Sequence, residues 1–340
     1  MLDARTWLFW AMTVLVIASS TRNPLYAILL LLIVTLVSAI CAPDQNRRAM
    51  LLPFRFAATA VPLAALFNAL TAHLGDTVLL RLPDWLPLLG GPLTLESLLF
   101  GATNGLVLTA IFGGFTLFNR ATPVRDLVQL APRAFHEAGV VLSIALTFVP
   151  QTTRSLARIR EAQAVRGHRV RGLRDWLPIV VPLLVSGLEH SMGLAEAMVA
   201  RGYGAVSDRA QPLRSQALLA LGLLMLLGGW LAWLFMPWKR AALSGMIAGA
   251  GLILAVLRLA GRAAPRTAYR PRRWSGRDTL TVLGCGLALA VVLLPLPGRA
   301  TLAYAPYPRL SLPPFDPLVG LGLLGLLAPV TVSGSRADHK

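Results

Sequence analysis

The chain has 340 residues, of which 56% are hydrophobic and 14% are charged, and its formal net charge is +17 at pH 7. This composition is too apolar for an ordinary soluble domain of that length, so it indicates an integral membrane protein. Nucleic-acid binding is a poor explanation of the positive charge, because the basic residues cluster between long apolar runs. The cysteines, Cys41 and Cys285, lack metal-binding spacing, so we expect no disulfide, no metal site and no cofactor.

Apolar runs of about 20 residues, the length that spans a bilayer, recur along the chain. Seven are expected, near 6–20, 24–41, 51–72, 94–119, 215–237, 241–260 and 278–297. A last run, 318–332, is short enough to be a half-span or an interfacial segment. We therefore predict an all-α fold, a polytopic membrane helical bundle with four segments: 1–119, 120–214, 215–297 and 298–340.

Basic residues predict the direction of each span, because Lys and Arg gather in cytoplasmic loops. With the N-terminus inside, the basic residues of the first loops and of the run before the last long span all fall on the cytoplasmic side. They are Arg47, Arg48, Arg120, Arg125, Arg262, Arg266, Arg270, Arg272, Arg273 and Arg277. Segment 120–214 is then cytoplasmic, and 73–93 and 298–316 face outward. The predicted location is a bacterial inner membrane.

Two interpretations of segment 120–214 remain open. It holds seven arginines between positions 154 and 174, although each Arg at the centre of a span costs about 2.5–3.5 kcal/mol. We therefore interpret its apolar stretches, 134–150 and 176–195, as helices on the cytoplasmic membrane surface or under the bundle. The alternative is a spanning hairpin, which would move the basic loop outside or require an odd helix elsewhere.

A short repeat lies in this segment. Glu161-Ala-Gln-Ala-Val-Arg166-Gly167 and Glu196-Ala-Met-Val-Ala-Arg201-Gly202 share Glu, Ala, Arg and Gly at the same four places. Each glycine is predicted at the left-handed position that ends a helix. Each arginine then lies near the negative end of the helix dipole, from which a guanidinium can hold a carboxylate of another protein in a bidentate grip. The plainer interpretation is that Arg-Gly is a common helix ending.

The repeat resembles the CbiQ/EcfT transmembrane components of energy-coupling factor transporters, whose signature is a pair of Ala-Arg-Gly motifs ending two coupling helices. Ala200-Arg201-Gly202 is a close match. The first copy, with Ala164, Arg166 and Gly167, has Val165 where alanine is usual. The likeness is clearest over about 120–205.

The resemblance implies long cytoplasmic or interfacial coupling helices, with each motif docked on an ABC ATPase subunit and with Glu161 and Glu196 in supporting positions. It also implies one or two such ATPases and a separate substrate-specific membrane subunit, which together import a vitamin or a transition-metal ion. The extension beyond about residue 260 is longer than family members usually have. We expect it to be dispensable for assembly with the ATPases.

ATP hydrolysis is expected in partner subunits rather than in this chain. A phosphate-binding loop needs a lysine after glycine, whereas the only lysines are Lys239 and Lys340, which follow Trp and His. The alternative function is a secondary carrier or an integral-membrane enzyme with its own substrate site. It is disfavoured, because the predicted spans hold almost no ionisable residues and the chain has no two similar halves.

Overall fold

A computed structural model describes most of the chain. The described residues are 2–41, 50–72, 75–82, 91–130, 136–168, 172–203, 213–262, 274–296, 298–307 and 310–334. They divide into two compact units, Met1–Leu127 with Arg270–Lys340 (unit 1) and Val128–Tyr269 (unit 2). Unit 1 joins the two ends of the chain, whereas the four predicted segments follow one another in the sequence. The two divisions describe different things, so the four segments stay a prediction.

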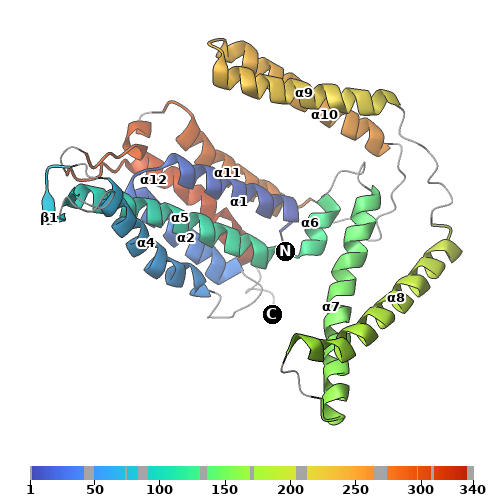
Figure 1. Ribbon diagram of the computed structural model, residues 1–340. Helices are drawn as coiled ribbons and strands as arrows, with labels where there is room; N and C mark the ends of the chain where they lie inside the picture. The colour runs from blue at the N-terminus through green and yellow to red at the C-terminus, as the bar shows by residue number, and fades with distance from the viewer. Residues whose placement is uncertain are drawn as a thin grey trace. The chain divides into compact units, whose positions relative to one another are not determined.

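Unit 1 contains most of the N-terminal helices, a small sheet and the C-terminal helices (Figure 1). Its elements are α1 (Ala4–Ser20), α2 (Pro24–Cys41), α4 (Leu52–Thr71), β1 (Val78–Leu82), β2 (Gly91–Thr94), α5 (Leu95–Ala121), α11 (Gly276–Leu293), η3 (Arg299–Leu302), α12 (Pro317–Leu324), η4 (Gly325–Leu327) and α13 (Ala328–Gly334). Helix α6 (Val124–Leu130) crosses the boundary between the two units.

Unit 2 consists of two helix pairs. Its elements are α7 (His136–Val165), η2 (Leu173–Trp176), α8 (Leu177–Ala200), α9 (Leu213–Phe235) and α10 (Lys239–Arg262). The α9–α10 pair packs closely through small residues, since a β-carbon on Gly249 would lie 2.8 Å from the carbonyl oxygen of Gly222. Such close backbone approach is typical of helix pairs in membranes.

The predicted all-α fold is confirmed, and the helices lie within a few residues of the apolar runs. Eight described helices are long and apolar enough to cross a membrane, and α7 and α8 are among them. Two features differ from the prediction. Strands β1 and β2 pair antiparallel within the loop that is predicted to face outward, and the C-terminal apolar run is broken by the 3-10 turn η4.

The C-terminal helices belong to the core of unit 1. Helices α11 and α12 pack against the first two helices of the chain, as the adjacent blue and orange-red ribbons of Figure 1 show. The indole Nε1 of Trp10, which is fully buried, donates to the carbonyl of Leu326 at 3.0 Å. Asn23 Nδ2 likewise donates to the carbonyls of Thr301 and Pro314 at 2.9 and 2.7 Å. The part of the extension from α11 onward is therefore built into unit 1 rather than appended to it.

The predicted direction of the spans stays a prediction. Several basic residues on which it depends lie outside the described residues; they are Arg47, Arg48, Arg266, Arg270, Arg272 and Arg273.

Candidate functional site

The first Arg-Gly motif ends α7 in a left-handed turn. Gly167 has a φ of +79°. Its backbone N–H donates to the carbonyl of Ala164 at 2.9 Å, and the next N–H, of His168, donates to that of Gln163 at 2.9 Å. This pair of bonds is the Schellman motif, which satisfies the last carbonyls of a helix.

The second motif ends α8 in the same way. Gly202 has a φ of +78°, and its N–H donates to the carbonyl of Val199 at 2.8 Å. The N–H of Tyr203 donates to that of Met198 at 3.0 Å. Both glycines thus adopt the predicted conformation, which confirms the helix-end geometry expected from the repeat.

Both arginines are exposed immediately after the last helical residue. Arg166 follows Val165, and Arg201 is the C-cap of α8. No hydrogen bond or ion pair joins either guanidinium to another residue that the structure describes, whereas Arg158, earlier on α7, donates to the hydroxyl of Ser155 at 3.1 Å. The two charges at the negative ends of these helices are therefore available to an external anion.

The remaining predicted site residues are also exposed. Ala164 and Glu161 lie on α7, and Ala200 and Glu196 on α8. No hydrogen bond or ion pair joins either glutamate side chain to another part of the described chain, so nothing in their contacts gives them a supporting role; that role stays a prediction.

Helices α7 and α8 pair antiparallel. Near the turn, Gln163 Nε2 donates to the carbonyl of Pro178 at 3.3 Å, and further along the ring of Phe148 stacks on His190 with centroids 5.8 Å apart. Arg166 therefore lies at the turn, directly after the end of α7, and Arg201 caps the far end of α8. The 24 residues of α8 span about 36 Å at a 1.5 Å rise. The two copies of the repeat therefore lie at opposite ends of α8.

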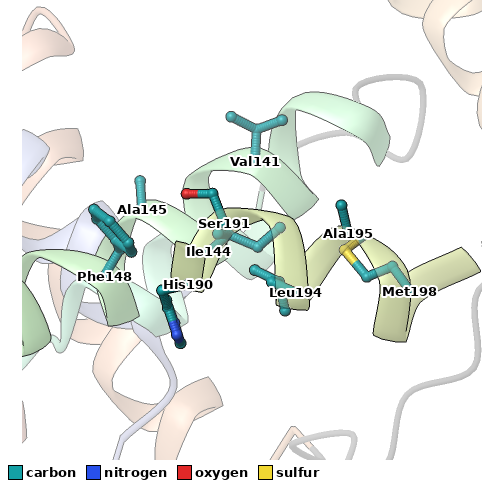
Figure 2. Close-up of a pocket in the computed structure, with 9 residues that line it drawn as sticks. All are labelled: Val141, Ile144, Ala145, Phe148, His190, Ser191, Leu194, Ala195 and Met198. Carbon is teal, nitrogen blue, oxygen red and sulfur yellow. The ribbon is translucent and has the colours of Figure 1, made fainter. Parts of the chain in front are cut away.

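An apolar groove lies between the two helices away from the turn. It encloses about 380 Å³, and Figure 2 shows side chains of both helices along it. The lining residues are Val141, Ile144, Ala145 and Phe148 from α7, and His190, Ser191, Leu194, Ala195 and Met198 from α8. Among the described residues, no group of three His, Cys, Asp or Glu side chains could hold a metal ion.

Apolar and charged halves alternate across this pair. The half of α7 that carries Arg154 and Arg158 lies beside the apolar first half of α8, because Gln163 contacts Pro178. The apolar first half of α7 lies beside the half of α8 that carries Glu196. At every position along the length of the pair, one of the two helices thus carries charged residues, which are costly at the centre of a bilayer. This arrangement favours the surface interpretation over the spanning hairpin, and the placement in the membrane stays a prediction.

Sequence reasoning missed the contacts that join the end of α7 to the start of α8. His168 Nε2 lies 2.7 Å from the carbonyl oxygen of Asp175, and Asp175 Oδ2 accepts from the N–H of Gly172 at 2.9 Å. A lone His carries no sequence signal for such a bond. The Gly-x-x-Asp spacing before an apolar run, in contrast, is typical of a helix start and could have marked the turn.

The profile of the CbiQ family, described as cobalt transport protein, matches residues 1–213. The chain belongs to this family. Similar proteins are each named energy-coupling factor transporter transmembrane protein EcfT. That of Streptococcus thermophilus is 35% identical, and the match covers 26% of this chain and 40% of the relative. That of Exiguobacterium sibiricum is 31% identical, with coverages of 32% and 51%.

The matched part of this CbiQ-family chain spans about half or less of these relatives. A third, EcfT 1 of Listeria monocytogenes, is 30% identical over 35% of this chain and 50% of its own length. Together with the eight apolar helices, the family establishes an integral membrane protein. Residues 214–340 lie beyond the match to the family profile.

Proposed function

We propose that the chain is the membrane-embedded coupling subunit of an energy-coupling factor importer. In this role it carries out no catalysis. One or two ABC ATPase subunits hydrolyse ATP, and the chain transmits their motion to a separate membrane subunit that binds the substrate. The description of the CbiQ family supports a transition-metal ion as one substrate class, and the resemblance of the motifs supports vitamins as another.

The observation that carries the proposal is the pair of exposed arginines, Arg166 and Arg201, at opposite ends of one helix pair, neither of which is bonded to another described residue. Each projects beyond a helix that a left-handed glycine has ended, so a second protein can approach without meeting the helix body. A bidentate Arg–carboxylate contact is specific in geometry as well as charge. Two such points about 36 Å apart suit two ATPase subunits better than one.

Co-purification tests the proposal. The tagged chain is co-expressed with the ABC ATPases of the same genome, and bound ATPase is quantified by immunoblot. Arg166→Ala and Arg201→Ala each strand a buried carboxylate of the partner, at a cost of about 2–5 kcal/mol. This corresponds to a loss of affinity of roughly thirtyfold to several thousandfold, and the double variant should capture no ATPase. Replacing each arginine by lysine instead of alanine should restore only part of the ATPase binding, because the ammonium lacks the two-pronged geometry of the guanidinium.

Arg160→Ala is the matched control, since Arg160 is an exposed arginine on the same helix and is not at its end. It should capture ATPase normally. Normal capture by the double variant, with normal insertion in the membrane, would show that the motifs are ordinary helix ends and would contradict the proposal.

A further inference from the structure

We infer that His168 is a positioning residue that fastens the first Arg-Gly end to the start of α8 and thereby aims Arg166. The consequence for docking rests on the proposed function, whereas the fastening itself does not. His168 is part of neither Arg-Gly motif, and it follows Gly167 directly in the chain.

The ring of His168 donates across the turn. Its Nε2 lies 2.7 Å from the backbone carbonyl oxygen of Asp175, in a partly buried position. A carbonyl oxygen can only accept, so Nε2 must carry the hydrogen, as it does in one neutral tautomer and in the charged ring. The bond is therefore compatible with either charge of the histidine.

The accepting carbonyl is held in place by its own turn. Asp175 Oδ2 accepts from the N–H of Gly172 at 2.9 Å, and the N–H of Asp175 donates back to the carbonyl of Gly172 at 3.2 Å. One helical turn further, Ile179 is buried, with 1% of its surface exposed. His168 thus bonds to a fixed point at the beginning of α8.

A second bond acts in parallel, because Gln163 Nε2 donates to the carbonyl of Pro178. His168 also closes the Schellman motif through its own N–H, which donates to the carbonyl of Gln163. One residue therefore bonds back to α7 through its backbone and across to α8 through its ring. Arg166, two positions earlier, is confined between these attachments.

The second end differs in its described contacts. Tyr203 occupies the position equivalent to His168, its side chain is 44% exposed, and no bond joins its hydroxyl to another described residue. Within the described part of the chain, only the end that carries Arg166 is therefore tied by a side chain to the neighbouring helix. A group that is already ordered loses less entropy on binding, so loss of the His168 bond should weaken docking at the first end specifically.

A distance measurement tests the fastening without any partner. Cys41 and Cys285 are replaced by Ser and Ala, and spin labels are attached through Val165→Cys and Leu177→Cys, at side chains that are 90% and 60% exposed. The full chain in lipid nanodiscs should give one narrow distance distribution. His168→Ala should broaden it, and His168→Gln should restore it, because the glutamine amide nitrogen reaches the place of Nε2. In His168→Asn the amide nitrogen reaches only the place of Nδ1, so this variant should not restore the narrow distribution.

ATPase capture tests the consequence. His168→Ala should lower the affinity about tenfold and His168→Gln should restore it, whereas Tyr203→Ala, the matched change at the second end, should have no effect. A narrow distance in His168→Ala, or a broadened distance with unchanged capture, would overturn the inference. Normal capture by the double arginine variant would instead remove the proposed function, and the distances would still decide whether His168 fastens the turn.

Discussion

Unit 1 and the α7–α8 pair differ in how many of their side chains they bury. In unit 1, helices from both ends of the chain enclose one core, and buried polar groups such as the Trp10 indole find partners there. In the α7–α8 pair most apolar side chains remain exposed, among them Val149 at 61% and Leu188 at 65%. Unit 1 therefore has a core of its own, although its exposed helix faces are apolar as well, with Leu63 at 68% and Phe67 at 66%. The described part of the pair buries few side chains, so lipid or other proteins must cover nearly all of it.

The comparison separates a unit with its own core from a helix pair that buries few of its side chains. All of the predicted site residues, Arg166 and Arg201 included, lie on the pair or directly after its helices, and unit 1 contains none of them. If this distinction is correct, substitutions in unit 1 should change stability, and substitutions in the pair should change assembly.

The largest effect is expected from a truncation after Arg262. It removes α11 to α13, and with them the acceptors of Trp10 and Asn23, so unit 1 should not fold. This outcome is the opposite of the expectation from sequence that the extension is dispensable. Size-exclusion chromatography in detergent measures it, with a truncation after Gly334 as the control that should remain monodisperse. A folded, ATPase-binding chain that ends at Arg262 would show that the C-terminal core is unnecessary.

The same substitution, Leu→Ala, can be made in both regions, and the resulting losses of stability can then be compared. Leu326 in unit 1 is fully buried, and Leu188 on α8 is 65% exposed. Leu326→Ala should destabilise unit 1 by about 2–5 kcal/mol, whereas Leu188→Ala should stay within about 0.5 kcal/mol. Thermal unfolding in detergent measures both changes. Equal shifts in Tm would contradict the contrast between a closed bundle and an open pair.

A smaller effect on stability than that of Leu326→Ala is expected at the end of α8. Gly202→Val forces a β-branched residue into a left-handed turn at a cost of about 1–2 kcal/mol, although a β-carbon there would meet no atom within 4 Å. The last turn should fray, which hydrogen exchange of the Tyr203 amide can detect, and ATPase capture should fall. Gly202→Asn should be tolerated, because asparagine adopts the left-handed conformation more readily.

Gly193→Ala is the control for that change. Gly193 lies inside α8 with open space around a β-carbon, so alanine should stabilise the helix by roughly 0.5–1 kcal/mol. Faster exchange in both variants, or in neither, would show that the backbone conformation of Gly202 is not what matters.

The sequence predicts which segments are helical and where α7 and α8 end. Hydropathy determines the first, because apolar run length matches bilayer thickness, and the glycines after Arg166 and Arg201 determine the second. Packing partners could not be predicted in this way. Every face of a membrane helix is apolar, so the contact of Trp10 with Leu326 depends on close approach and one hydrogen bond, which hydropathy does not record.

The fastening by His168 was also beyond sequence reasoning. Its acceptor is a backbone carbonyl, which every residue possesses, so no residue type identifies the partner. The β1–β2 hairpin was missed for a related reason, since Val78–Leu82 is short and lacks the alternation of polar and apolar residues that indicates a strand.

The antiparallel α7–α8 pair has the geometry of a lever. Its two proposed points of attachment, Arg166 and Arg201, lie at opposite ends of the pair rather than side by side. If two subunits bound at these ends move in the same direction, the α7–α8 pair is translated. If one subunit moves sideways relative to the other, across the axis of the pair, the pair is tilted. Over a length of about 36 Å, a displacement of a few ångströms at one end alone becomes a rotation of several degrees, which the groove between the helices would share.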